Sequence, residues 1–144
     1  KIAKVLPHVH MIQSIDSVRL LEKVEEKASE LGLCPEVLIQ VNTSGESSKS
    51  GCSLQDAPTL CERAAASTQI RFQGLMTIGP LGGSEQDTRK SFRVLRDIRE
   101  KYAPAAAQLS MGMSSDFEWA IEEGSTMVRI GSLLLQRHYP GAKE

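Results

Sequence analysis

The stretch from Leu109 to Ser132 constrains the fold most, because it contains two short apolar strands with one short helix between them. We expect the first strand to end at Ser110 and the second to run over Met127–Ile130. Two strands joined by one helix lie side by side and parallel, since the right-handed crossover leaves little alternative. The stretch therefore predicts a β-α-β unit in which the carboxyl ends of both strands lie at the same end of a sheet.

Local signals define the helix within this unit. Ser115 and Glu118 have the Ser-x-x-Glu spacing of a capping box, which predicts the start of the helix. Gly124 is expected to end it in the left-handed conformation. Gly131 and Ser132 follow the second strand directly, and a run of three leucines then begins another helix. Such a turn offers backbone N–H groups and a hydroxyl to an anion.

The rest of the chain also alternates between two kinds of segment. Apolar, β-branched runs predict strands, and amphipathic charged segments predict helices. Besides a helical start at 1–6, the expected strands are 8–15, 36–41 and 70–76, and the expected helices are 16–32 with Asp16 as its cap, 53–67 and 85–102. Five strands that alternate with helices indicate a parallel sheet.

Composition excludes several classes of partner. The formal net charge of −1 gives no electrostatic reason to expect nucleic acid or an anionic membrane surface. No apolar run approaches the roughly 18 residues of a membrane span. The three cysteines, Cys34, Cys52 and Cys61, have no paired spacing. We therefore expect free thiols in a reducing compartment, with the cytoplasm as the first expectation.

The same C-terminal stretch resembles a known family. Leu-Ser-Met-Gly-Met-Ser-x-Asp at 109–116, Ala-Ile at 120–121 and Gly-Ser-Thr-Met-Val-Arg-Ile-Gly-Ser at 124–132 are similar to the signature of the pyridoxal phosphate homeostasis proteins. That family is a single-domain relative of the barrel domain of alanine racemase. Eight or more positions that match in one order make the resemblance specific.

The resemblance implies the fold class. It is α/β, a parallel (β/α) barrel of the TIM type that is incomplete, with about five C-terminal strands of the usual eight. The length of 144 residues also lies below the roughly 200 that a closed barrel needs. We therefore expect residues 1–144 to be the C-terminal portion of a single barrel domain that binds pyridoxal 5′-phosphate (PLP).

The resemblance also assigns candidate site residues. Ser110, Gly131, Ser132 and the backbone at Ile130 are implied to hold the cofactor phosphate. Arg129 is implied to face the pyridine nitrogen, where a cation keeps that nitrogen unprotonated and weakens the cofactor as an electron sink. From the residues alone, Arg129 is equally an ordinary strand-end arginine paired to a carboxylate. Gly131 and Ser132 are equally an ordinary helix-capping turn.

In this family a lysine at the end of the first barrel strand holds PLP through a Schiff base. The eight lysines of this chain are Lys1, Lys4, Lys23, Lys27, Lys49, Lys90, Lys101 and Lys143, and none lies in that context. The resemblance therefore implies that this chain retains the phosphate end of the site and lacks the Schiff-base lysine.

Three hypotheses on function follow. The first is a non-catalytic PLP-binding protein of intracellular PLP homeostasis, monomeric when complete, with no nucleic-acid, membrane or metal partner. The second is an amino-acid racemase of the alanine-racemase type, which takes a catalytic tyrosine from a second domain that we do not expect here. The third is a truncated fragment that binds nothing and associates through the open edges of its sheet.

Overall fold

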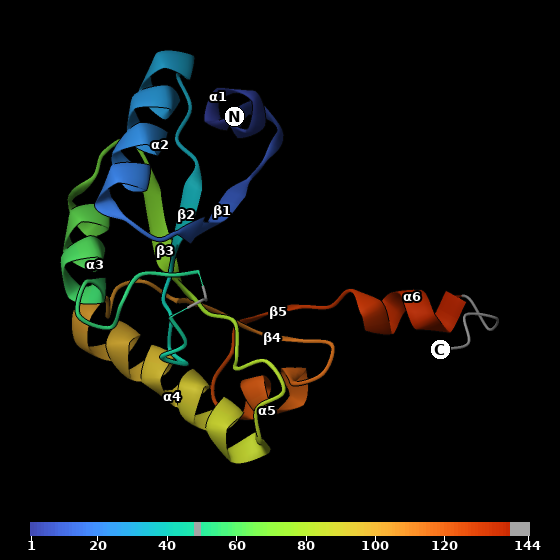
Figure 1. The fold of residues 1–144 in the computed structure, drawn as a ribbon. Coiled ribbons are helices and arrows are strands. Elements are labelled where there is room, and N and C mark those ends of the chain that lie inside the picture. Colours follow the sequence, from blue (N-terminus) through green and yellow to red (C-terminus); the bar gives the residue numbers. More distant parts are fainter. Residues whose placement is uncertain (48–49, 139–144) are drawn as a thin grey trace.

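The computed structural model describes residues 1–47 and 50–138 (Figure 1). Strands and helices alternate along them, as predicted. In order they are α1 (Ile2–Val5), a 3-10 turn (Leu6–His8), β1 (Met11–Ile15), α2 (Val18–Leu31), β2 (Glu36–Gln40), α3 (Ala57–Ala66), β3 (Arg71–Met76), α4 (Glu85–Tyr102), β4 (Gln108–Met113), α5 (Phe117–Glu122), β5 (Met127–Arg129) and α6 (Ser132–His138).

The five strands form one sheet in the order β1-β2-β3-β4-β5. Each neighbouring pair is parallel, as expected where a helix returns the chain between strands. Figure 1 shows the sheet curled, with α2, α3 and α4 along its convex side and β1 and β5 at its edges. The predicted fold class, a parallel α/β barrel with only part of its strands, is confirmed.

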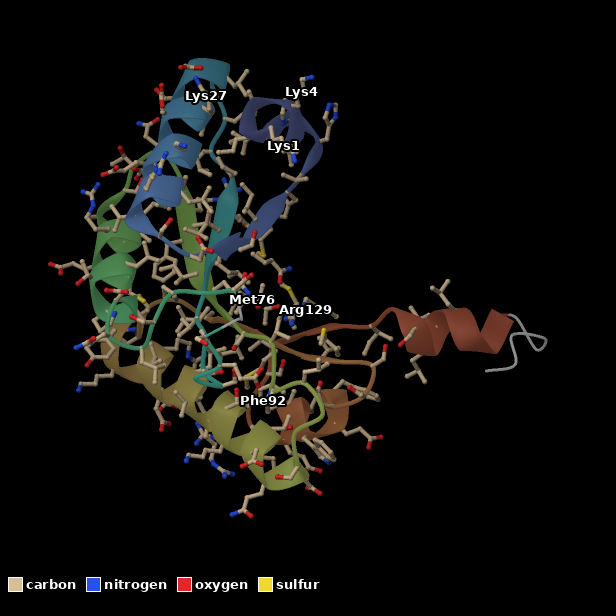
Figure 2. The ribbon with its side chains drawn as sticks, viewed as in Figure 1. Lys1, Lys4, Lys27, Met76, Phe92 and Arg129 are labelled. Carbon is tan, nitrogen blue, oxygen red and sulfur yellow. The ribbon has the colours of Figure 1, made fainter. Side chains whose placement is uncertain are left out.

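The main core lies between the sheet and these helices. Side chains alternate between the two faces of a strand, so Val37 and Ile39 of β2 face the helices together. Leu21 of α2, Leu60 of α3 and Phe92 of α4 belong to the same core cluster and are fully buried. Figure 2 labels Phe92 on α4. Burying one such side chain contributes about 1.5–3 kcal/mol, so this layer supplies most of the hydrophobic stabilisation.

The concave side of the sheet is more polar. Gln40 and Ser110 are buried there, in strands whose alternate residues face the helices. Leu38 and Met76 are also buried yet do not belong to the core under the helices. The concave side therefore combines buried apolar side chains with side chains that can donate or accept hydrogen bonds.

Two strand glycines permit close packing. A Cβ at Gly74 would lie 1.9 Å from the carbonyl oxygen of Gln108, so β3 and β4 approach as closely as they do only with glycine there. Gly112 in β4 has φ +98°, and a Cβ there would lie 2.6 Å from Cβ of Ala120 on α5. Glycine at 112 therefore allows α5 to lie directly on the end of β4.

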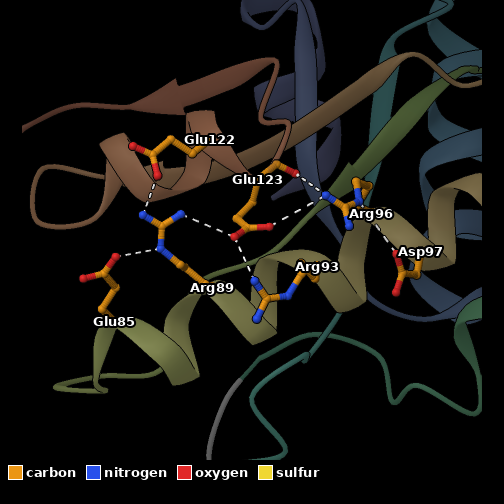
Figure 3. Close-up of polar contacts among 7 residues, drawn as sticks. All are labelled: Glu85, Arg89, Arg93, Arg96, Asp97, Glu122 and Glu123. Atoms are coloured by element: carbon orange, nitrogen blue, oxygen red, sulfur yellow. Dashed lines mark hydrogen bonds and ion pairs between the residues drawn. The ribbon is translucent and has the colours of Figure 1, made fainter.

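An ion-pair cluster fixes α5 against α4 (Figure 3). The Glu123 side chain is only 10% exposed and contacts Arg93 Nη1 at 2.9 Å through Oε1. Arg89 and Arg96 of α4 contact the same carboxylate at 3.4 and 3.7 Å. Arg89 also pairs with Glu122. These contacts hold the helix that directly follows the β4–α5 turn.

Several expected boundaries were wrong. The first strand begins at Met11 rather than at residue 8, because Pro7 lies in a 3-10 turn. Ser17, not Asp16, caps α2, and its Oγ accepts a hydrogen bond from Leu20 N at 3.2 Å. The strand expected to end at Ser110 continues to the end of β4. Gly112 explains that difference, because its missing side chain lets the strand run on beneath α5.

The expected capping box at the start of α5 was also wrong. Asp116 occupies the N-cap position and makes no side-chain capping bond. Gly124 does end this helix as predicted, with φ +100°. Its N–H donates to Ile121 O at 3.0 Å, and Ser125 N donates to Ala120 O at 2.9 Å. This pair of bonds is the Schellman motif, which satisfies the last carbonyls of the helix.

No helix in the described part of the chain is long and apolar enough to cross a membrane.

Candidate functional site

The turns after β4 and β5 meet where these strands end. Ser114 lies in the first turn, and its Oγ accepts hydrogen bonds from the backbone N–H groups of Gly131 and Leu133, each at 3.2 Å. Asp116 closes the first turn, since its Oδ1 accepts a hydrogen bond from Met113 N at 2.7 Å. The turn that carries Gly131 is thus joined directly to the turn that precedes α5.

A cavity of about 510 Å³ opens beside these turns. Small-molecule sites typically have volumes of roughly 300–1,000 Å³. The lining residues come from both turns and from β5, and they are Met113, Ser114, Ser115, Arg129, Gly131, Ser132 and Leu133. Three of the expected site residues, Arg129, Gly131 and Ser132, therefore share one cavity. The other two, Ser110 and Ile130, do not line it.

Arg129 supplies the positive charge of the cavity. Its Nη1 donates to Ser110 Oγ at 2.8 Å, and its Nη2 donates to Thr77 O at 3.0 Å. A guanidinium has five N–H groups, so these two bonds leave donors for a ligand. Burial lowers the pKa of Arg129, and the carboxylate of Asp116 opposes that change. Arginine nevertheless stays protonated in proteins, so the charge is permanent.

Ser110 lies deeper than expected. It is fully buried within β4, below the end of the strand at Met113. Its hydroxyl donates to Gln13 Oε1 at 2.6 Å and accepts from Arg129. Ser110 therefore contacts the arginine of the cavity. Its proton and one of its lone pairs are already engaged in hydrogen bonds within the protein.

Ser114 is a candidate site residue that the sequence patterns did not indicate. It lies within the stretch that resembles the family, but a strand that ends at Ser110 would leave Ser114 away from the strand end. With the strand extended to Met113, Ser114 is the first residue of the turn. Its oxygen bridges two backbone N–H groups, which is the arrangement that an anion oxygen would adopt there.

Gly131 leaves room beside these N–H groups. A Cβ at this position would meet no atom within 4 Å, and its φ is not in the left-handed region. The fold itself therefore does not require glycine at 131. Glycine there keeps space open next to the donors of Gly131 and Leu133.

The lysines with described side chains lie away from this cavity. None of Lys1, Lys4, Lys23, Lys27, Lys90 and Lys101 is among its lining residues. Figure 2 shows Lys1 just before α1, Lys4 on α1 and Lys27 on α2, well apart from Arg129. Lys49 and Lys143 lie outside the described residues.

The donor set fits a ligand that carries an anionic group and an acceptor atom. Backbone N–H groups and the hydroxyls of Ser114 and Ser132 can donate hydrogen bonds to a phosphate, and Arg129 can donate to the acceptor atom of the ligand. Met113 and Leu133 add apolar surface for a ring. By contrast, no three His, Cys, Asp or Glu side chains in residues 1–47 and 50–138 group in a way that could hold a metal ion.

Curated relatives are similar in sequence to nearly the whole of this chain. The pyridoxal phosphate homeostasis protein of Aquifex aeolicus is 39% identical, with 96% of this chain and 63% of the relative covered. The homeostasis protein of Bos taurus is 41% identical, with 93% of this chain and 53% of the relative covered. The chain thus spans between about half and two thirds of the length of these curated relatives.

A solved structure agrees with the fold. PipY of Synechococcus elongatus, whose structure has PLP bound, matches with a TM-score of 0.84 at 32% identity. The match covers 93% of this chain and 64% of PipY. The family described as the N-terminal domain of alanine racemase matches residues 1–137. The resemblance to the homeostasis proteins is therefore confirmed, and the chain belongs to the family of the alanine racemase N-terminal domain.

Proposed function

We propose that residues 1–144 are part of a single barrel domain that binds PLP and serves PLP homeostasis without turning over a substrate of its own. The names of the relatives and the bound PLP in PipY support this proposal. The single observation that carries it is the cavity in which Arg129 lies beside the N–H groups of Gly131 and Leu133.

The phosphate of PLP would bind at the turn between β5 and α6. The N–H groups of Gly131 and Leu133 and the hydroxyls of Ser114 and Ser132 would donate to its oxygens. Hydrogen bonds to an ionised phosphate are roughly twice as strong as bonds between neutral groups, so several of them hold a small ligand firmly. Ser114 would turn its oxygen away from the two N–H groups and donate its proton instead.

Arg129 would face the pyridine nitrogen. Two of its N–H groups are engaged with Ser110 and Thr77, and the remaining donors can reach a ring acceptor. A permanent cation there disfavours protonation of the ring nitrogen. PLP supplies an electrophilic aldehyde and an electron-withdrawing ring when bound, and an unprotonated ring withdraws electrons less. This arrangement suits storage and transfer of the cofactor.

Within this chain the cofactor would be held without a covalent bond to lysine. The lysines with described side chains do not line the cavity. Treatment with PLP and borohydride, followed by peptide mass spectrometry, tests this point. We expect only low, scattered modification of exposed lysines. Stoichiometric modification of one lysine would show that a covalent site exists in the chain.

A racemase is the alternative, since the family is described by that enzyme. Arg129 does not discriminate between the two functions, because the related racemase fold also places an arginine at the ring nitrogen. Tyrosine does discriminate, because the racemase needs a catalytic tyrosine. Tyr102 ends α4 and does not line the cavity, and Tyr139 lies outside the described residues. Racemisation of alanine by the PLP-loaded full-length protein separates the two functions, and the proposed function expects none.

Titration with PLP and with pyridoxal tests the proposed site. Gly131→Ala should weaken PLP binding at least about tenfold, because its methyl group fills the space beside the phosphate donors. Pyridoxal, which lacks the phosphate, should bind weakly and should not respond to that change. Arg129→Gln should weaken the binding of both ligands. Arg71→Gln is the matched control, since Arg71 begins β3 and is 53% exposed. Equal PLP affinities for the parent and Gly131→Ala would contradict the assignment.

A further inference from the structure

A chain of polar side chains lies behind Arg129, on the concave side of the sheet. Arg129 Nη1 donates to Ser110 Oγ at 2.8 Å, and Ser110 Oγ donates to Gln13 Oε1 at 2.6 Å. Gln13 Nε2 then donates to Met127 Sδ at 3.2 Å. Gln13 is on β1 and Ser110 on β4, and two other strands separate them in the sheet. Their contact therefore depends on the curl of the sheet.

The chemistry of the groups determines the direction of each hydrogen bond in this series of side chains. An arginine can only donate, so Ser110 Oγ must accept from Arg129, and its single proton must point elsewhere. The sulfur of Met127 can only accept, so the amide nitrogen of Gln13 faces it, and Gln13 Oε1 faces Ser110 and accepts that proton. Without Gln13 the hydroxyl of Ser110 could rotate, and its proton would then face the donors of Arg129.

The guanidinium of Arg129 has a second anchor at Thr77 O, 3.0 Å from Nη2. Because the guanidinium is planar, anchors on both terminal nitrogens fix its position within the plane. Loss of the anchor at Ser110 would let the group pivot about the remaining bond. The N–H groups that face the cavity would then lose their fixed direction.

We propose that Gln13 is a positioning residue which, through Ser110, aims the guanidinium of Arg129 and so makes the cavity selective for a ring that carries a nitrogen acceptor. The inference rests on the proposed function, in which Arg129 faces the pyridine nitrogen of PLP. Gln13 touches neither the cavity nor the phosphate turn, so its effect is confined to the ring end of the ligand.

The test compares PLP with its carbocyclic analogue, in which a C–H replaces the ring nitrogen. The parent should bind PLP about tenfold more tightly than the analogue, which corresponds to one hydrogen bond from a charged donor. Gln13→Leu removes the acceptor and should bring the ratio close to one. Gln13→Glu keeps an acceptor of the same length and should restore the preference. Gln73→Leu, a change of the same type on β3, is the control and should leave the ratio unchanged.

Ser110→Ala provides an independent route to the same result. It should abolish the preference for PLP over the analogue as Gln13→Leu does. The double variant should reduce the preference no further, because both changes interrupt the same series of hydrogen bonds. A preference that survives Gln13→Leu and Ser110→Ala would overturn the inference while leaving PLP binding in place.

A measurement without ligand separates this inference from the proposed function. Side-chain NMR of Arg129 reports how slowly its Nη groups rotate in the free protein. We expect slow rotation in the parent and in Gln13→Glu, and faster rotation in Gln13→Leu. If the parent fails to bind PLP, the proposed function fails, and this measurement alone decides whether Gln13 holds Arg129. Identical rotation rates in the parent and Gln13→Leu would refute the role of Gln13.

Discussion

Gly112→Ala should destabilise the fold through two separable effects. The backbone at 112 has φ +98°, where a residue with a Cβ is strained by about 1–2 kcal/mol. The new methyl group would also lie 2.6 Å from Cβ of Ala120, so α5 must move away from β4. Overpacking of this kind costs about 1–3 kcal/mol. The expected loss in the free energy of unfolding is therefore about 2–5 kcal/mol.

Gly124→Ala is the matched control for strain. Gly124 has φ +100°, but the atom nearest to its added Cβ is Arg96 Cδ at 3.7 Å, an ordinary contact. Its cost should therefore be about 1–2 kcal/mol, without the packing contribution. In an Ala120→Gly background the cost of Gly112→Ala should fall, because the nearest clashing methyl group is gone, but it should stay above that of Gly124→Ala, because the added Cβ still lies 3.1 Å from Phe117 Cα.

Urea unfolding measures these differences, with the fluorescence of Trp119 on α5 as the probe. Trp119 is the only tryptophan, so the signal reports on the helix that should move. Equal costs for Gly112→Ala and Gly124→Ala, or no recovery in the Ala120→Gly background, would refute the account of how α5 packs on β4.

Three further predictions concern side chains away from β4. Glu123→Gln should lower the free energy of unfolding by about 1–3 kcal/mol, less than for a fully buried pair because its arginine partners are partly exposed. Glu122→Gln should change it by less than about 0.5 kcal/mol, because the side chain of Glu122 is 62% exposed. Thiol reagents at pH 8 should modify exposed Cys34 rapidly and Cys52 and Cys61 only on unfolding, because burial raises the pKa of Cys52 to about 12 and that of Cys61 to about 11. For the same reason the contribution of these two thiols to the free energy of unfolding should be complete below their ordinary pKa of 9.0 and should decrease as pH rises towards 12. A pH series of urea titrations in which the free energy of unfolding does not decline above pH 9 would contradict this.

The order of strands and helices could be predicted because each element carries a local signal. The apolar run 36–41 and the glycine at 124 have meanings that do not depend on the rest of the chain. Boundaries that depend on tertiary packing could not be predicted in this way. Gly112 resembles a turn residue in the sequence, but the strand continues through it because α5 covers that side.

The candidate site shows the same division. Arg129 and Gly131 are neighbours in the sequence, so their common position at the end of β5 followed from the strand itself. Ser114 could have been found only with the correct end of β4. Gln13 could not have been found at all, because its contact with Ser110 joins two strands that are not adjacent in the sheet. Contacts across a curled sheet depend on its curvature, which no local pattern encodes.

The backbone amides of the phosphate turn test the central claim most directly. In an NMR titration of the chain with PLP, the amide signals of Gly131 and Leu133 should shift most, because both N–H groups would exchange the oxygen of Ser114 for a phosphate oxygen. Inorganic phosphate should shift the same two signals, while pyridoxal should leave them in place. Unchanged signals at Gly131 and Leu133 in the presence of saturating PLP would contradict the account.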